Sequence, residues 1–358
     1  MTSYRIAVIP GDGIGVDTID EAVQALETVC QAHGGLSMTF DPYPWGCQYY
    51  LREGKMMPDD GLRILADYDS ILFGAVGFPP VPDHVSLWGL LLPIRQAFDQ
   101  YINLRPVKLL PGVPGPLRDK GPEEIDFVCI RENTEGEYGG VGGRVHRGST
   151  DEVAIQTAIF TRMGVERVLR YGFELARKRP RKELVSATKS NALQYTMVFW
   201  DEVFHALAEE YADITCRQYH VDALAARFVT APESLDVVVA SNLFGDILTD
   251  LGGALQGSLG IPPSGNINPQ GNYPSLFEPV HGSAPDIAGK GIANPIAAIW
   301  AASMMLDHLG HEEAGRLMWD AVAAVTAEGE TLTPDLGGSA TTKEVGQAIC
   351  EQIRTLSA

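Results

Sequence analysis

Apolar residues along the chain follow two different spacings, which together predict an α/β fold. Tyr4–Pro10 is a short, almost continuous apolar run, as expected of a buried strand. After a glycine-rich loop, apolar residues recur every three or four positions up to Gly34, which predicts a helix. Further short apolar runs, most of them followed by a helical pattern, stand at Ser70–Val76, Phe127–Ile130, Leu184–Ala187 and Val237–Ala240. We therefore expect a largely parallel sheet covered by helices, with a mostly helical C-terminal third.

Two irregular segments interrupt this pattern. Pro106–Pro122 is rich in proline and glycine, and we interpret it as a crossing between two domains. Gly139–Ala158 reads as turns followed by a strand. The second segment fits either an arm that pairs with another subunit or an ordinary surface hairpin, and the sequence leaves both open.

The first glycine loop is a weak nucleotide signal. Gly11, Gly13 and Gly15 alternate, so the full dinucleotide-binding spacing is missing. Asp12 inside the loop would also face a pyrophosphate unfavourably. A tight turn between strand and helix explains the loop at least as well as nucleotide binding does.

The charge balance restricts the class of partner. The chain has 27 basic and 46 acidic residues, a formal net charge of −19, which disfavours binding to nucleic acid and to anionic membranes. An acidic substrate would also be repelled unless arginine, lysine and a metal ion gather at its site. The five cysteines form no C-x-x-C pair, and no secretory signal or membrane-spanning stretch is visible. We therefore expect a protein of the reducing cytoplasm.

The most distinctive local pattern is an acidic helix predicted over Asn242–Gly253. Asp246 and Asp250 stand four residues apart, which places both carboxylates on one helix face. The buried face is expected to consist of Leu243, Ile247 and Leu251, with Leu248 and Leu255 beside it. Such oxygen ligands suit Mg²⁺ or Mn²⁺. Asp222 offers a third carboxylate. For the isolated pair, a solvated helix face is the simpler interpretation.

Cationic and phenolic side chains follow several of the apolar segments. Arg95, Arg105 and Arg131 could together bind two substrate carboxylates, although each taken singly is better explained as a surface salt bridge. Tyr138 could donate a proton, or simply pack. Lys189 follows a strand and could act as a base beside a divalent cation, or lie on the surface.

Six motifs occur together and in order along nearly the whole chain: IPGDGIG, LRP, RENTEGEYGG, TKSN, NLFGDILTDLGG and EPVHGSAPDIAGKGIANP. In this combination the chain resembles the β-decarboxylating dehydrogenases, the family of the isocitrate, 3-isopropylmalate and tartrate/D-malate dehydrogenases, and it is most similar to the tartrate/D-malate branch. The resemblance implies a two-domain α/β fold with a shared large sheet, which is not a Rossmann fold. The cofactor-binding domain would comprise 1–104 plus 258–358. The substrate, metal and dimerisation domain would comprise 105–257, with an inter-subunit arm at about 139–159.

The resemblance also implies roles for individual residues in a homodimer with shared active sites. Asp246 and Asp250 would bind the metal together with Asp222 of the other subunit. The three arginines, Arg95, Arg105 and Arg131, would hold the substrate carboxylates. Lys189 of the other subunit would take the hydroxyl proton, and Tyr138 would protonate the product carbon. The implied cofactor contacts are His281, Gly282, Ser283, Ala284, Asp286, Asn294 and Asn191.

The cofactors implied by the resemblance are NAD and Mn²⁺ or Mg²⁺, with a monovalent cation such as K⁺ as a further candidate. Asp286 would accept hydrogen bonds from both ribose hydroxyls and repel a 2′-phosphate, which favours NAD. We expect oxidation of a (2R)-hydroxy dicarboxylic acid, tartrate or D-malate or both, with decarboxylation of D-malate to pyruvate and CO₂.

The segment before Arg95 bears on the choice of acid. Isopropylmalate enzymes carry Glu seven residues before this arginine, where Trp88 stands here, and isocitrate enzymes carry Ser six residues before it, where Gly89 stands here. A bulky apolar segment without an extra cation suits a four-carbon diacid. The alternatives are 3-isopropylmalate dehydrogenase and, from another class, a non-catalytic metal- or nucleotide-binding protein.

Overall fold

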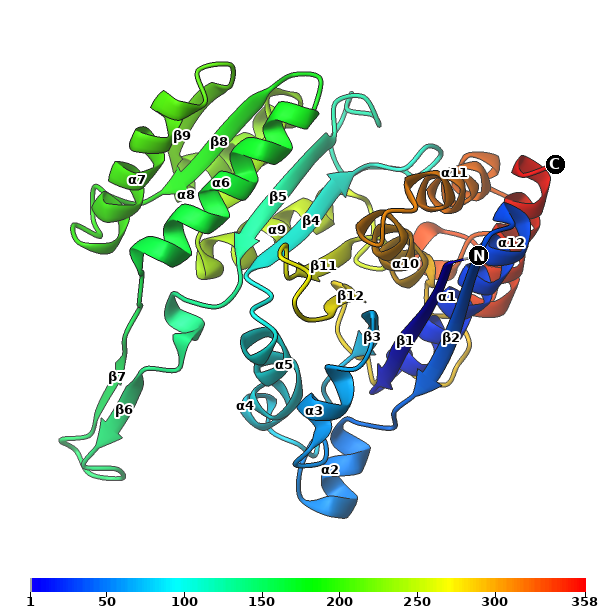
Figure 1. Ribbon diagram of the computed structural model, residues 1–358, viewed down its shortest axis with the longest axis horizontal. Helices are drawn as coiled ribbons and strands as arrows, with labels where there is room; N and C mark the ends of the chain where they lie inside the picture. The colour runs from blue at the N-terminus through cyan, green and yellow to red at the C-terminus, as the bar shows by residue number, and fades with distance from the viewer. Residues whose placement is uncertain (1) are drawn as a thin grey trace. The chain divides into compact units, whose positions relative to one another are not determined.

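The computed structural model describes residues 2–358 as two compact units (Figure 1). Unit 1 comprises residues 1–100, 108–122 and 253–358, and unit 2 comprises Tyr101–Val107 and Glu123–Gly252. Lys108–Pro122 therefore groups with unit 1, whereas the division expected from the sequence assigns 105–257 to one domain. That expected division stays a prediction.

Unit 1 has five neighbouring strands in the order β2-β1-β3-β12-β11. β1, β2, β3 and β12 pair in parallel, and β11 pairs antiparallel with β12. The strands are β1 (Thr2–Gly11), β2 (Leu36–Pro42), β3 (Ser70–Ala75), β11 (Pro263–Ile267) and β12 (Ser275–Pro279). The opening strand, the helix after it and the strand at Ser70 confirm the elements predicted there.

The helices of unit 1 are α1 (Ile14–His33), α2 (Cys47–Glu53), α3 (Gly61–Leu65), α4 (Asp83–Ser86), α5 (Leu92–Ala97), α10 (Ile296–His308), α11 (Glu312–Glu328) and α12 (Thr342–Leu356). A π-helical turn η1 (Leu87–Leu91) leads directly into α5, and a short 3₁₀ turn η4 (Pro334–Leu336) precedes α12. α10 is buried along almost its whole length and packs against α1 and α11.

Besides a separate hairpin, unit 2 has five neighbouring strands in the order β4-β5-β10-β8-β9, and β5, β10, β8 and β9 pair in parallel. They are β4 (Ile102–Lys108), β5 (Asp126–Glu132), β8 (Glu183–Thr188), β9 (Thr215–His220) and β10 (Val237–Ala240). The helices are α6 (Arg162–Lys178), α7 (Thr196–Glu210), α8 (Val221–Thr230) and α9 (Asn242–Leu255), with 3₁₀ turns η2 (Glu137–Gly139) and η3 (Pro232–Ser234).

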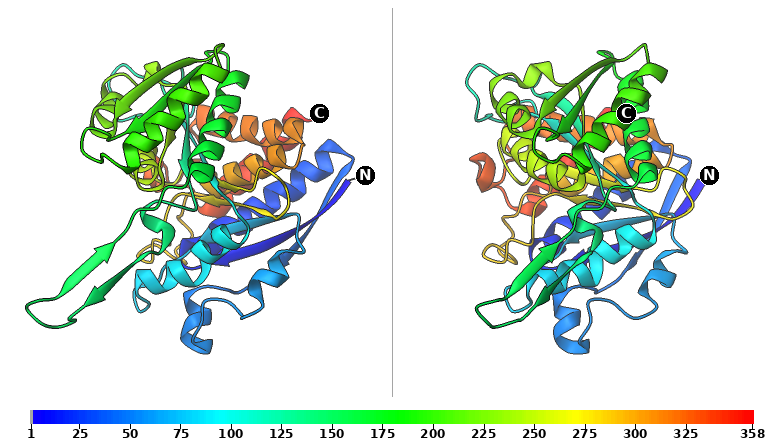
Figure 2. Two further views of the ribbon diagram at one scale, coloured as in Figure 1. Left: turned by 60° about the vertical axis from the view of Figure 1, so that its left-hand side comes forward. Right: turned by 90° about the vertical axis from the view of Figure 1, so that its left-hand side faces the viewer.

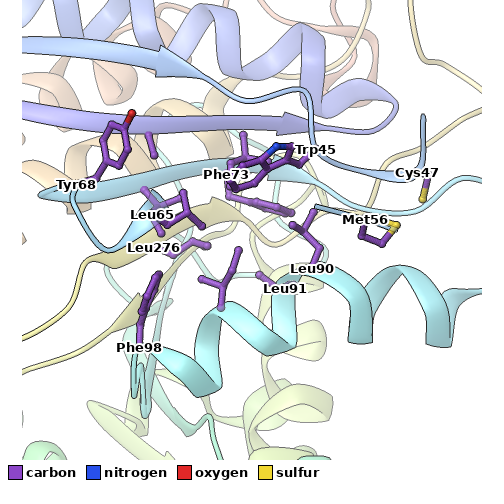
Figure 3. Packing of buried hydrophobic residues seen from close by; sticks show 14 of the residues in the cluster. Trp45, Cys47, Met56, Leu65, Tyr68, Phe73, Leu90, Leu91, Phe98 and Leu276 are labelled. Carbon is purple, nitrogen blue, oxygen red and sulfur yellow. The ribbon is translucent and has the colours of Figure 1, made fainter. Parts of the chain in front are cut away.

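A hydrophobic cluster of unit 1 fixes the segment that carries Arg95 (Figure 3). Phe73 of β3 and Trp45 belong to it, together with Leu90 and Leu91 of η1 and Ile94 of α5. All five side chains are buried. Burying each large apolar side chain contributes roughly 1.5–3 kcal/mol, so the backbone of α5 is held firmly against the sheet of unit 1.

A separate hairpin extends away from α6 and β8 of unit 2 (Figures 1 and 2). Its strands β6 (Gly142–Val145) and β7 (Val153–Gln156) pair antiparallel, and every residue in both strands is exposed. The exposed side chains include Val145 and Ile155. An isolated two-stranded hairpin is marginally stable in water, and a role for this segment as an inter-subunit arm stays a prediction.

Within residues 2–358, each helix is too short or too polar to cross a membrane.

Candidate active site

Asp246 is the point at which three distant parts of unit 2 meet. It lies on α9, which follows β10 directly. One carboxylate oxygen accepts a hydrogen bond from Nη1 of Arg131, and the other accepts from the hydroxyl of Tyr138 at 2.9 Å. Nη1 of Arg105 lies 3.7 Å from the same carboxylate. The fold thus brings together four of the predicted site residues.

The two arginines are buried, and their hydrogen bonds are accepted by two neutral side chains that were not among the predicted site residues. Asn242 Oδ1 accepts from Arg131 Nε at 3.0 Å and from Nη2 at 2.8 Å, while Thr249 Oγ1 accepts from Arg105 Nη1 at 2.6 Å. Both partners lie on α9 within the motif that contains Asp246. Their spacing from Asp246, four residues before and three after, puts them on the same helix face and could have pointed to them.

The buried face of α9 differs from the one predicted. Ile247 was expected to be buried but is 58% exposed, so that prediction is wrong. Leu248 and Leu255 are buried as expected, and the helix also turns small residues inward. A Cβ added to Gly245 would lie 2.6 Å from Arg131 Cβ, and one added to Gly252 would lie 2.6 Å from Val107. The two glycines let α9 approach the strands closely enough for Asp246 to reach the arginines.

Asp250 is exposed, one helical turn beyond Asp246. Its pKa is raised, first by partial removal from water and then by the charge of Asp246, and Arg105 and Arg131 oppose the shift. Two carboxylates in this arrangement suit a hard divalent cation. Among residues 2–358, however, no three His, Cys, Asp or Glu side chains are grouped so as to hold a metal ion. Within the described part of one chain, Asp246 and Asp250 lie on the same helix, and Asp222 is not grouped with them.

Lys189 and Asp222 form a second charged pair in unit 2. Lys189 follows β8 directly and Asp222 lies in the first turn of α8, just after β9. These strands are parallel neighbours, so their carboxyl ends lie side by side. Lys189 Nζ donates to Asp222 Oδ1 at 2.7 Å, and this contact lowers the pKa of Asp222.

Two glutamates of the RENTEGEYGG motif hold the loop that carries Tyr138. Glu132 is buried, which raises the pKa of its carboxyl, and it accepts hydrogen bonds from the backbone N–H groups of Thr134 and Glu135. Glu135 accepts from the backbone N–H and the hydroxyl of Thr161, the N-cap of α6. Their role is thus to anchor the loop, and Tyr138 reaches Asp246 from it.

Arg95 belongs to unit 1, where its guanidinium pairs with a buried acid. Arg95 Nη2 donates to Glu278 Oε1 at 2.9 Å, and the two side chains are 7% and 8% exposed. Asn266 Nδ2 donates to the same oxygen at 2.7 Å. Glu278 opens the EPVHGSAPD motif, which is the signal that could have identified it.

The predicted cofactor segment, His281–Asp286, lies in unit 1 against the first glycine loop. Ile14 N donates to Ser283 O at 2.8 Å, and a Cβ added to Gly13 would lie 1.9 Å from that oxygen. Ala284 has a φ of 37°, an unfavourable conformation for a residue with a Cβ. Close contacts between backbone atoms therefore fix the conformation of this segment.

The acid inside the glycine loop, Asp12, has a structural role. It is buried, and its carboxylate accepts from the backbone N–H of Cys47 at 2.8 Å and of Gly77 at 3.0 Å. The loop is thus a tight turn whose acid joins two other loops of unit 1.

The remaining predicted cofactor residues differ in burial. Asn294 is buried, donates to Asp335 and accepts from the backbone N–H of Ile296 at the start of α10. Burial lowers the pKa of His281, which favours the neutral imidazole. Gly282 and Asp286 are exposed in unit 1, and Asn191 is exposed in unit 2, two residues after Lys189.

The segment expected to contact the variable part of the substrate, Val85–Arg95, contains the π-helical turn η1. Trp88 is 42% exposed, and a Cβ added to Gly89 would lie 2.5 Å from Met56 Cγ. Met56 is buried, so a serine in place of Gly89 would require Met56 to move. The absence of a side chain at position 89 is therefore built into the packing of unit 1.

Comparison with known proteins gives matches over almost the whole chain. The family model described as isocitrate/isopropylmalate dehydrogenase matches residues 5–349. A probable tartrate dehydrogenase/decarboxylase of Bacillus subtilis is 56% identical, and the match covers 99% of both chains. D-malate dehydrogenase (decarboxylating) of Escherichia coli is also 56% identical, again over 99% of both chains.

A solved structure supports the same relationship. Isocitrate dehydrogenase from Methylococcus capsulatus has a TM-score of 0.88 and 36% sequence identity, and the match covers 98% of this chain and 99% of that chain. These matches confirm the predicted fold class and the predicted enzyme class. The chain belongs to the isocitrate/isopropylmalate dehydrogenase family.

Proposed function

We propose that this dehydrogenase uses NAD and Mn²⁺ or Mg²⁺ to oxidise a (2R)-hydroxy dicarboxylic acid, tartrate or D-malate or both, and that it decarboxylates D-malate to pyruvate and CO₂. The observation that carries the proposal is the meeting of Arg105, Arg131 and Tyr138 at Asp246. The names of the tartrate and D-malate relatives support the choice of substrate.

The chemistry has two parts. In the oxidation, a base takes the proton of the C2 hydroxyl and a ketone forms at C2; NAD⁺, when bound, would accept the hydride that C2 loses. In the decarboxylation, the bond between C3 and its carboxylate breaks, the ketone takes up the electron pair, and C3 then receives a proton. The ketone must form first because it is the acceptor for those electrons.

Arginines supply the binding of the diacid. Arg105 and Arg131 are buried at fixed positions, and a guanidinium can donate two parallel hydrogen bonds to a carboxylate. Arg95 is the third arginine of the proposed set. Local positive charge of this kind offsets the repulsion that a net charge of −19 would exert on a diacid.

Two side chains are proposed to move protons. Lys189, contributed by a second subunit, takes the proton of the C2 hydroxyl as the neutral amine, and Asp222 accepts a hydrogen bond from the ammonium group that results. Tyr138 gives a proton to C3, and its hydrogen bond to Asp246 fixes the orientation of the hydroxyl. Each proton transfer thus has its own side chain.

Asp246 and Asp250 fit a divalent cation, with Asp222 of a second subunit as the third carboxylate. When bound, the cation supplies Lewis-acid polarisation of the C2 oxygen. The cofactor residues proposed are His281, Gly282, Ser283, Ala284, Asp286, Asn294 and Asn191. Asp286 is exposed and so accessible to ribose hydroxyls, and its charge disfavours a 2′-phosphate. A requirement for K⁺ stays a prediction.

We further propose a homodimer whose two chains complete each other's sites. The hairpin β6–β7 exposes Val145 and Ile155, which suits it as an arm that pairs with the equivalent arm of a second copy. The five cysteines are free, consistent with a reducing cytoplasm as the site of action.

The second candidate is 3-isopropylmalate dehydrogenase, because the family model also covers enzymes of that name. Trp88 argues against it, since isopropylmalate enzymes carry Glu at that position. The remaining alternative from the sequence, a non-catalytic binding protein, is set aside by the membership of the chain in a dehydrogenase family.

The test is NAD reduction with Mn²⁺ and D-malate, each tartrate isomer, 3-isopropylmalate or isocitrate as substrate. D-malate or a tartrate should be preferred, and preferred turnover of isopropylmalate would remove the proposal. Asp250→Asn should lower turnover by about two to three orders of magnitude. Glu313→Gln, which changes a 94% exposed acid on α11, is the matched control and should leave turnover unchanged. A fully active Asp250→Asn variant would refute the assigned role of α9.

A further inference from the structure

Glu278 is a buried acid of unit 1 that the proposed reaction does not use. It lies on β12, and its side chain is 8% exposed. Its Oε1 accepts two hydrogen bonds, from Arg95 Nη2 at 2.9 Å and from Asn266 Nδ2 at 2.7 Å. A buried carboxylate is costly unless it is paired and hydrogen-bonded, and this one is both.

The strands behind Glu278 fix where its carboxylate stands. Asn266 on β11 pairs with Leu276 on β12, and Ser264 pairs with Glu278 in the same antiparallel register. Asn266 therefore lies on the strand next to Glu278, two residues from Ser264, which is the residue that pairs with Glu278. Because the sheet fixes both backbones, the carboxylate can serve as an anchor for another side chain.

Arg95 is restrained at both ends. Its backbone belongs to α5, which the neighbouring Ile94 and Leu91 fasten to the core cluster of Figure 3. Its guanidinium is tied to Glu278 through Nη2. Nε is buried and has no hydrogen-bond partner in the part of the chain that the structure describes. A buried charged donor without a partner is unfavourable, so this nitrogen is suited to an anionic ligand.

We propose that Glu278 is a positioning residue for binding of the diacid. It holds Arg95 by Nη2, and Asn266 holds Glu278, so that Nε of Arg95 remains available for a substrate carboxylate. This inference rests on the proposed function, in which Arg95 binds one carboxylate. Glu278 itself touches Arg95 and not the substrate, so its effect on the reaction is exerted through Arg95.

Three interpretations of the ion pair predict different changes in KM for Glu278→Gln. The Gln variant keeps an acceptor oxygen and the side-chain shape but weakens the tie to Arg95. If Glu278 positions Arg95, KM for the diacid rises. If Glu278 mainly neutralises Arg95, loss of its charge strengthens the attraction for an anion and KM falls. If the pair only stabilises the fold, KM is unchanged and only the unfolding midpoint moves.

The experiment measures KM and kcat of the Mn²⁺-loaded, NAD-saturated enzyme with whichever diacid the wild type oxidises best. We expect KM for the diacid to rise about tenfold with kcat changed by less than about threefold, because a carboxylate contact is present in both ground and transition states. A lower or unchanged KM would overturn the proposal. Glu278→Asp shortens the side chain by one carbon, should also raise KM, and serves if the Gln variant does not fold.

Two controls isolate the positioning role. Asp236→Asn is the control for loss of a buried acid, because Asp236 is 1% exposed and accepts from Arg179, which is 24% exposed, in unit 2; it should lower stability without changing KM. In an Arg95→Lys background, Glu278→Gln should add no further change in KM, since Glu278 acts through Arg95. The two proposals fail separately: a wild type that prefers isopropylmalate refutes the four-carbon substrate, whereas an unchanged KM with any diacid refutes the role of Glu278.

Discussion

Glu21 provides a sharp test of how burial governs the stability of unit 1. It lies on α1 with 1% of its surface exposed, and its Oε2 finds no hydrogen-bond partner among residues 2–358. A Cβ added to Gly346 of α12 would lie 2.0 Å from that oxygen. The glycine therefore leaves just enough room for a carboxyl group between the two helices.

The size of the effect follows from the pKa of Glu21. Burial raises this pKa from 4.5 to about 7, Asp20 adds to the shift, and Lys343 on α12 opposes it. A shift of this size corresponds to about 3 kcal/mol lost when the buried group is ionised. Between pH 4.5 and 7 the folded chain binds more protons than the unfolded chain, so stability falls as pH rises through this window and the full cost is present above pH 7.

Glu21→Gln removes the charge and keeps the shape. Above pH 7 the variant should be more stable than the wild type by about 1–3 kcal/mol, because the buried amide still lacks part of its hydrogen bonding. The advantage should shrink as pH falls toward 4.5. The assay is urea unfolding followed by circular dichroism, with midpoints compared at equal protein concentration across the pH range.

The matched control is Glu27→Gln, which changes an exposed acid on the same helix. Its midpoint should differ from that of the wild type by an amount that does not depend on pH. If the midpoint difference of Glu21→Gln also stayed constant across the pH range, ionisation of Glu21 would carry no cost and the reasoning from burial would fail.

Two further predictions concern unit 2. Asn242→Ala should lower kcat/KM for the diacid about tenfold to a hundredfold, because Arg131 loses both hydrogen bonds to the amide oxygen. Kinetics indistinguishable from those of the wild type would show that Asn242 does not hold Arg131. Ile155→Lys should shift the assembly from dimer to monomer in sedimentation, because it places a charge on the exposed hairpin. The control, Leu356→Lys on α12, should leave the dimer intact. A dimer that persists in Ile155→Lys would contradict the role of the arm.

The sequence predicts where several of the candidate site residues lie. Asp246 and Asp250 were expected on one helix face, and Arg131 and Tyr138 were expected beyond the end of a buried strand. Both expectations depend on local spacing, which a sequence displays directly. The meeting of these residues at Asp246 then follows from the rule that the ends of neighbouring parallel strands lie together.

Helix spacing places Asn242 and Thr249 on the face of Asp246, but it does not predict which side chains they contact. Thr249 and Asn242 are neutral residues on a helix, and their contacts with Arg105 and Arg131 arise only once α9 lies against the strands. The exposure of Ile247 has the same origin, because Gly245 and Gly252 are the residues that approach the strands closely. Periodicity counts apolar residues and so overlooks a face made of small ones.

The strand β11 escaped prediction for a related reason. Pro263–Ile267 contains Pro, Ser, Gly and Asn, residue types that are depleted in strands. It is nevertheless fully buried, because Asn266 uses its side chain to satisfy Glu278 on the neighbouring strand. The hydrogen-bonded network thus overrides local propensity, and a single sequence does not reveal such a network.

The most direct test of the account is product analysis with D-malate that carries carbon-13 in the carboxylate attached to C3. Incubated with NAD⁺ and Mn²⁺, the enzyme should release labelled CO₂, unlabelled pyruvate and NADH in equal amounts. Failure to consume D-malate and the tartrates, together with rapid oxidation of 3-isopropylmalate under the same conditions, would contradict the proposed function.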